Sequence, residues 1–102
     1  ALKALQHPNI VRVLGIYVDR VTGSVYIATE YMPLGGVDRL VDAEADSLSA
    51  ADLLAMACDA CRGMQLVALK GFVHRDVSLR NLLAGDSNDA NVRFVVKVSD
   101  LG

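Results

Sequence analysis

One charged stretch, residues 74–81 with the sequence H-R-D-V-S-L-R-N, constrains this chain more than any other feature. It lies between two apolar runs, residues 71–73 and 82–84. A charged segment in that setting is typical of a loop held in place by buried elements. Within it, the Asp76 carboxylate can accept a proton from a hydroxyl. Five residues later, the amide oxygen of Asn81 can ligate a metal. The stretch therefore predicts a loop with a chemical role.

A second oxygen ligand, Asp100, follows 19 residues after Asn81 and begins the sequence D-L-G. Carboxylate and amide oxygens both suit a hard cation such as Mg²⁺. The two stretches together resemble the protein kinase catalytic loop, H-R-D-L-x-x-x-N, followed by a variant of D-F-G. A lone His-Arg-Asp triplet is usually a solvated turn. The eight-residue match with a downstream Asp-x-Gly is much rarer by chance.

Composition narrows the remaining classes. The chain has 102 residues, enough for one small domain, and its 53% hydrophobic and 22% charged content argues against disorder. A net charge of -2 gives no sign of a nucleic-acid surface or a polybasic membrane surface. No apolar run is long enough to predict a membrane-spanning helix. We therefore expect neither nucleic acid nor membrane as a partner of this segment.

Cys58 and Cys61 form a C-x-x-C pattern within a helical segment. A zinc site would need a second pair of ligands, and a redox motif would need a thioredoxin-like context. Neither is present, so we expect both to be small buried helix residues.

Hydrophobic periodicity and turn chemistry predict an α+β chain. The expected elements are a helix end at 1–6, a hairpin from 10–18 and 25–31, a connector at 32–36, a short helix at 37–41, a long helix after a Ser49–Asp52 capping box, and a second hairpin from 82–84 and 92–98. The long helix should end at Gly71. Its expected buried face comprises Leu53, Ala57, Ala60, Met64 and Val67.

This order resembles the middle of a protein kinase domain over essentially the whole chain. Residues 7–11, H-P-N-I-V, are similar to the segment after helix C, and residues 25–32 are similar to the strand-to-hinge segment of tyrosine kinases. The resemblance implies a partial two-lobed fold. Residues 1–31 would end the small lobe, 32–36 would form the hinge, and 37–102 would begin the large lobe.

The resemblance also implies roles for the charged residues, with ATP and Mg²⁺ as cofactors. Asp76 would orient the substrate hydroxyl and accept its proton, and Asn81 and Asp100 would hold Mg²⁺. Arg80 would help to neutralise the transferred phosphate. It matches the tyrosine-kinase form H-R-D-L-A-A-R-N, whereas serine/threonine kinases usually have Lys at the position of Ser78. We therefore expect tyrosine specificity, with serine/threonine specificity left open.

Four other residues would contact adenine or border its pocket. Thr29 matches the gatekeeper, and the backbone of Glu30 and of Met32 would meet adenine. Leu83 matches the residue that forms the floor beneath it. ATP and a protein substrate are the implied partners, and the cytoplasm is the implied location.

Several departures leave alternatives open. Leu101 replaces the Phe of D-F-G, and the polar segment 86–91 lengthens the second hairpin and should loop out. The 102 residues contain no glycine-rich phosphate loop, strand-three Lys or helix C Glu. We therefore expect an internal kinase fragment that is inactive alone. The alternatives are a piece of a pseudokinase scaffold and, less closely matched, a small-molecule kinase.

Overall fold

The structure is a computed structural model that describes residues 6–71 and 78–99. In chain order its elements are β1 (Val13–Val18), β2 (Val25–Thr29), β3 (Gly35–Gly36), α1 (Val37–Ala43), α2 (Ala50–Leu69), the 3₁₀ helix η2 (Leu79–Asn81), β4 (Leu82–Asp86) and β5 (Phe94–Val98). The predicted α+β class, both hairpins and both helices are confirmed. The helix expected at 1–6 lies almost wholly outside the described residues. Within the described ranges, no helix combines the length and apolar character needed to cross a membrane.

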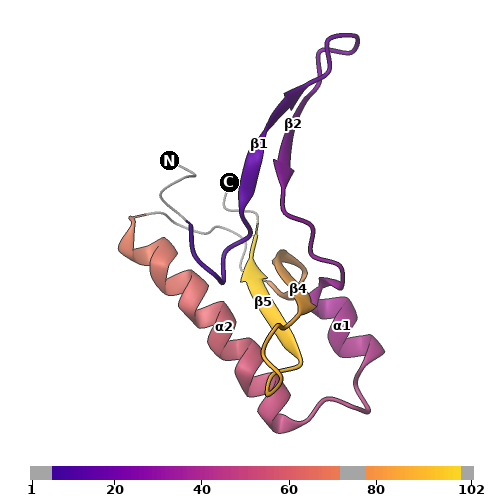
Figure 1. Cartoon of the computed structure of the whole chain (residues 1–102), viewed down its shortest axis with the longest axis vertical. Helices are drawn as coiled ribbons and strands as arrows, with labels where there is room; N and C mark the ends of the chain where they lie inside the picture. The colour runs from indigo at the N-terminus through magenta and orange to yellow at the C-terminus, as the bar shows by residue number, and fades with distance from the viewer. Residues whose placement is uncertain (1–5, 72–77, 100–102) are drawn as a thin grey trace.

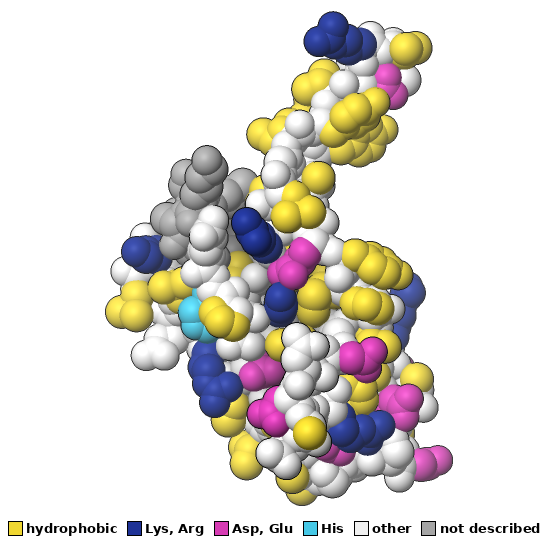
Figure 2. All heavy atoms as spheres, viewed as in Figure 1, with side chains coloured by type: hydrophobic (Ala, Val, Ile, Leu, Met, Phe, Trp, Pro, Cys, Tyr) yellow, Lys and Arg dark blue, Asp and Glu magenta, His cyan; other side chains and the backbone are white. Residues whose placement is uncertain are grey.

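Strands β1 and β2 form an antiparallel hairpin that projects from the rest of the molecule (Figure 1). Asp19 shapes its turn, because the carboxylate accepts a hydrogen bond from the Val21 amide at 2.9 Å. Apolar side chains lie along much of the hairpin (Figure 2). More than half of each of the following is exposed: Leu14, Ile16, Tyr17, Val18, Val25, Tyr26 and Ile27. A two-stranded sheet without a buried face is marginal in water, so contacts at the hairpin's base must hold its position.

The second sheet has the order β3-β4-β5 and is antiparallel throughout. Helix α2 runs along β5, and α1 lies on the side of β4 (Figure 1). The main core is formed by side chains from these elements: Val37, Leu40, Met56, Ala84, Phe94 and Val96. The register pairs Leu82 with Val98, so the start of β4 and the end of β5 lie side by side.

Helix α2 begins at the predicted capping box. The Ser49 hydroxyl accepts from the Asp52 amide, and the Asp52 carboxylate accepts from the Ser49 amide, both at 3.0 Å. These bonds satisfy two amide groups that a helix start leaves without intrahelical partners. The helix ends just before Gly71, whose positive φ of 78° stops it as predicted.

The predicted buried face of α2 is wrong in part. Met56, Gly63 and Val67 are the buried residues, whereas Leu53 is 45% exposed and Ala57 is exposed. Gly63 accounts for the difference. A Cβ atom there would meet the Asn9 carbonyl oxygen and would lie 2.8 Å from Val98 Cγ2. The helix thus approaches its neighbours through a residue that a hydrophobic pattern does not count.

The burial expected for the cysteines also needs correction. Cys58 is half-buried, but Cys61 is exposed, and both are free thiols. Cys61 lies away from the stripe formed by Met56, Gly63 and Val67, which faces β5. Its place on the helix surface, and not its residue type, determines its exposure.

Candidate functional site

The structure describes six of the eight predicted site residues: Thr29, Glu30, Met32, Arg80, Asn81 and Leu83. Asp76 and Asp100 lie outside the described residues. The described residues include the segment that follows Asp76, from Ser78 onward, and the residue before Asp100, Ser99.

Asn81 ends η2 and is buried, with only 6% of its surface exposed. Its backbone amide donates to the Ser78 carbonyl at 3.1 Å, which closes the turn. Its backbone carbonyl accepts two hydrogen bonds from Ser99, one from the backbone amide at 2.9 Å and one from the side-chain hydroxyl at 2.8 Å. Ser99 directly precedes Asp100 in the chain. The structure therefore joins the segments that carry the two predicted metal ligands.

Ser78 is another polar residue of this turn. Its hydroxyl oxygen is buried and has no hydrogen-bond partner in the part of the chain that the structure describes. A buried hydroxyl without a partner costs about 1–3 kcal/mol, so such groups are uncommon in folded proteins. Ser78 follows the predicted catalytic Asp76 by two residues.

Arg80 is exposed and lies within η2. Its backbone lies against the start of α1, since a Cβ atom on Gly36 would be 3.4 Å from the Arg80 carbonyl oxygen. A Cβ atom at that distance would make an ordinary van der Waals contact, so the two segments lie within contact distance of each other. Arg80 thus begins from a fixed backbone position, with its side chain at the surface.

The connector after β2, residues 32–36, runs beside β4 and is hydrogen-bonded to it. The Leu34 amide donates to the Ala84 carbonyl at 3.1 Å, and Gly36 pairs with Leu83. Met32 is buried, and its methyl carbon lies 3.4 Å from the place that a Cβ atom on Gly85 would take. The structure therefore brings Met32 close to β4, the strand that carries Leu83.

Glu30, which lies between β2 and the connector, has a side chain with several hydrogen bonds. Its carboxylate accepts from the Arg12 amide at 2.9 Å and from Lys97 Nζ at 2.9 Å and 3.0 Å. Burial would raise the pKa of Glu30, but these donors hold it below its ordinary value of 4.5. The Glu30 amide donates to the Arg12 carbonyl at 2.9 Å. Because the Glu30 amide is already bonded within the hairpin, a backbone contact from Glu30 to a ligand would use its carbonyl.

Thr29 ends β2, where it is exposed and pairs with Val13. It is adjacent in sequence to the anchored Glu30. It therefore lies just before the connector, and its role as gatekeeper stays a prediction.

Sequence reasoning missed Lys97 and Ser99. Lys97 lies between Val96 and Val98, which are each 1% exposed, so alternation along β5 directs its side chain to the other face. That pattern marks a lysine on a strand face but does not identify its partner. The hydroxyl of Ser99, next to Asp100, was a local signal that could have been noticed.

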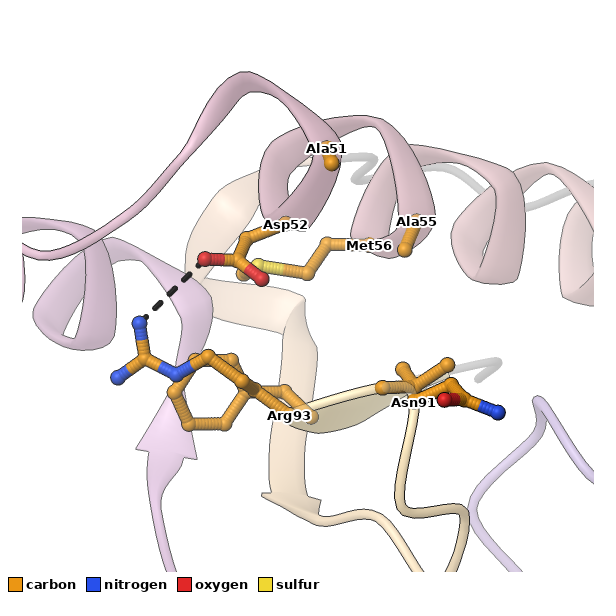
Figure 3. Close-up of a pocket in the computed structure, with 8 residues that line it drawn as sticks. Ala51, Asp52, Ala55, Met56, Asn91 and Arg93 are labelled. Atoms are coloured by element: carbon orange, nitrogen blue, oxygen red, sulfur yellow. Dashed lines mark hydrogen bonds and ion pairs between the residues drawn. The ribbon is translucent and has the colours of Figure 1, made fainter.

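In the part of the chain that the structure describes, one pocket, of about 330 Å³, is open and is lined by Gln6, His7, Ile10, Arg12, Glu30 and Lys97. A smaller pocket, of about 60 Å³, lies beside the first turn of α2 (Figure 3). There Arg93 points toward Asp52, with 3.4 Å between the charged groups, and also contacts Glu44 at 3.7 Å. None of the predicted site residues lines this smaller pocket.

The polar segment 86–91 lies next to that smaller pocket. Apart from Asp86, which ends β4, it forms an exposed turn in which the Asp89 carboxylate accepts from the Asn91 amide at 2.9 Å. The expectation that the lengthened hairpin loops out is therefore confirmed.

Within residues 6–71 and 78–99, no group of three or more His, Cys, Asp or Glu side chains could hold a metal. The predicted donor set is different in kind, because it pairs the Asn81 amide with the carboxylate of Asp100. The described member of that set is Asn81, a buried residue at the end of η2 whose amide oxygen is a donor of the kind that suits a hard cation.

Comparison with known proteins shows which sequences this chain is similar to. The family model described as protein tyrosine and serine/threonine kinase matches residues 1–102. The chain is 37% identical over 102 residues to the tyrosine-protein kinase ABL2 of Homo sapiens, covering 99% of this chain and 8% of that protein. It is 39% identical over 99 residues to the tyrosine-protein kinase csk-1 of Caenorhabditis elegans, covering 96% of this chain and 17% of that protein. The chain thus spans a small part of the length of these relatives.

Proposed function

Because this chain belongs to the protein tyrosine and serine/threonine kinase family, we propose that it supplies the hinge and catalytic loop of an ATP-dependent protein-tyrosine kinase. Residues 1–31 would end the small lobe, residues 32–36 would be the hinge and residues 37–102 would begin the large lobe. The protein that carries them would transfer the γ-phosphate of ATP to a tyrosine hydroxyl. A role in signalling and a location in the cytoplasm, where ATP is available, follow from that activity.

The observation that carries this proposal is the double hydrogen bond from Ser99 to the Asn81 carbonyl. Phosphoryl transfer depends on groups that are positioned before the reaction and on neutralisation of the phosphate charge. A turn that ties Asn81 to the residue before Asp100 meets the first requirement. Asn81 and Asp100 would hold Mg²⁺, and the bound cation would neutralise charge on the phosphates.

Two residues of the catalytic loop would act on the substrate. Asp76 would accept the proton of the hydroxyl from within hydrogen-bond reach, about 2.6–3.2 Å. Arg80 would place a positive charge near the transferred phosphate, because guanidinium binds phosphate strongly. Its exposed position on η2 leaves room for a protein substrate beside it.

The connector would bind adenine. The Glu30 carbonyl and the Met32 backbone would provide the polar contacts, and Leu83 would lie beneath the ring. The pairing of residues 34–36 with β4 through backbone hydrogen bonds supports this assignment. Thr29 would border a pocket beside the adenine.

The test uses the natural protein that contains this chain, with paired peptides that differ only in Tyr or Ser at the acceptor position. We expect phosphorylation of the Tyr peptide. Asp76→Asn should lower its rate by about 10²-fold or more, as is typical for loss of a general base. Arg80→Ala should lower kcat more than it weakens nucleotide binding, because its charge acts during transfer.

The outcomes separate the parts of the proposal. Preference for the Ser peptide would overturn the tyrosine assignment and leave the kinase assignment in place. Nucleotide binding without any transfer, unchanged by Asp76→Asn, would indicate a pseudokinase that acts by binding.

A further inference from the structure

We infer that the ion pair between Glu30 and Lys97 is a positioning device, which holds the hinge at a fixed place relative to the strand that leads to Asp100. The inference rests on the proposed function, because it assigns these side chains a role in binding ATP with Mg²⁺. Neither side chain would touch the nucleotide. They would act by keeping a fixed distance between the hinge, which would bind adenine, and the metal ligands, which would bind Mg²⁺.

The pair joins elements that are far apart in the sequence. Glu30 directly follows β2, and Lys97 lies in β5, 67 residues later. Lys97 Nζ contacts both carboxylate oxygens, at 2.9 Å and 3.0 Å. The Arg12 amide donates to the same carboxylate at 2.9 Å, which fixes the carboxylate from the side of β1. The two side chains are only 18% and 28% exposed, so solvent screens them less than it screens a fully exposed pair.

Lys97 extends from a rigid strand. Its neighbours Val96 and Val98 are each 1% exposed. The Asn9 side chain donates to the Val96 carbonyl at 3.0 Å, and the Val98 amide donates to the Asn9 carbonyl at 2.9 Å. Lys97 therefore offers its charge from a fixed backbone position, three residues before Asp100.

The hairpin needs such a link on its second strand. The chain entering β1 is tied to β5 by backbone, because the Val11 amide donates to the Val98 carbonyl at 2.9 Å. The chain leaving β2 is joined to β5 by the Glu30–Lys97 pair. These two side chains also line the open cavity of about 330 Å³. The pair therefore adds a charged link between Glu30 and β5 to the backbone bonds that hold residues 34–36 along β4.

Loss of the Glu30–Lys97 ion pair should affect two kinds of ligand differently. Adenosine would engage the hinge alone, whereas ATP with Mg²⁺ would engage the hinge and the metal ligands together. Loss of the pair would leave each end intact and loosen their separation. It should therefore weaken the binding of ATP with Mg²⁺ and leave the binding of adenosine unchanged.

The experiment measures Kd for ATP with Mg²⁺ and for adenosine by calorimetry, in the natural protein that contains this chain. The first variant is Lys97→Met, which keeps the length of the side chain and removes its charge. We expect Kd for ATP with Mg²⁺ to rise about tenfold and Kd for adenosine to change by less than about twofold. Lys97→Arg should restore most of the affinity for ATP, because its guanidinium retains the charge and can bind a carboxylate with two hydrogen bonds.

A matched control and a second variant make the result decisive. Lys70→Met removes the same charge from an exposed residue at the end of α2 and should alter neither Kd. Glu30→Gln keeps the shape and the acceptor for the Arg12 amide, so it tests the pair if Lys97→Met fails to fold. It should reproduce the selective loss of affinity for ATP.

Three results for the variants would overturn the inference. Equal loss of both ligands would make the pair a general support of the hinge, and unchanged affinities would remove any role in binding. Failure of both variants to fold would make the pair an element of stability alone. A wild-type protein that binds adenosine and ATP but transfers no phosphate would contradict only the proposed catalytic function. Absence of any nucleotide binding would overturn both.

Discussion

The Asn81 carbonyl accepts both the amide and the hydroxyl of Ser99, at 2.9 Å and 2.8 Å. Ser99, the first residue after β5, thus makes two hydrogen bonds to the last residue of η2. The amide bond belongs to the backbone and is available to any residue except proline. The hydroxyl bond depends on serine itself, so this part of the link can be removed alone.

We predict that Ser99→Ala lowers the free energy of unfolding by about 1 kcal/mol, the usual contribution of one hydrogen bond. It should also raise the Mg²⁺ concentration needed for half-maximal activity, because the segment before Asp100 is held less firmly. Urea unfolding and a Mg²⁺ titration measure the two effects. Ser24→Ala, at an exposed position in the β1–β2 turn, is the matched control. An unchanged Mg²⁺ requirement would separate the hydroxyl bond from metal binding.

Local signals made much of the fold predictable. The Ser49–Asp52 capping box and the stop at Gly71 depend on residues a few positions apart, so the sequence contains all that determines them. The two hairpins are likewise set by alternation and turn residues close in the chain. The protein kinase family was recognisable because the motif of residues 74–81 is contiguous.

Contacts between distant residues could not be predicted in the same way. No local pattern pairs Glu30 with Lys97, since each is one charged residue among several. The buried face of α2 was misassigned because it is centred on Gly63, whose contribution is an absence of side chain. Such a contact exists only once the helix is placed against the Asn9 carbonyl.

We predict that Gly63→Ala destabilises the protein by about 1–3 kcal/mol, the usual cost of overpacking a tight contact. The new methyl group would meet the Asn9 carbonyl oxygen and Val98 Cγ2, and a backbone group cannot move aside easily. Gly15→Ala is the control, because nothing lies within 4 Å of a Cβ atom there. Urea unfolding of both variants checks the prediction. Equal stability of the two would mean that α2 does not approach β5 so closely in solution.

A pH dependence follows from Glu30, whose pKa is held below its ordinary value of 4.5 by the Arg12 amide and by Lys97 against the opposing effect of burial. A lowered pKa in the folded state means that the carboxylate stabilises the fold above about pH 4.5. That contribution is lost as the pH falls through the folded-state pKa. Glu30→Gln should therefore be less stable than wild type at pH 7, by about 1 kcal/mol or less for a partly exposed pair.

The two proteins should converge in stability as the pH falls below 4.5. Thermal unfolding at intervals from pH 7 to pH 3 measures the difference between them. Asp19 and Asp52 also have lowered pKa values, each chiefly through a backbone hydrogen bond, from Val21 and Ser49 respectively. They act equally in both proteins and cancel in the difference. A gap that stays constant with pH would show that the Glu30 charge does not stabilise the fold.

The last prediction concerns Thr29, which ends β2 directly before the anchored Glu30. Because Glu30 is bonded to Lys97 and to Arg12, the hinge cannot retreat easily from a larger neighbour. Thr29→Met should therefore fill the space beside adenine and leave the hinge contacts in place. Overpacking of about 1–3 kcal/mol corresponds to a loss of affinity of about 5-fold to about 150-fold for inhibitors that extend past the gatekeeper. The KM for ATP should change by less than about threefold. Thr22→Met, in the exposed turn of the same hairpin, is the control. Unchanged affinity across a panel of such inhibitors would remove Thr29 from the gatekeeper position while leaving the catalytic-loop assignment untouched.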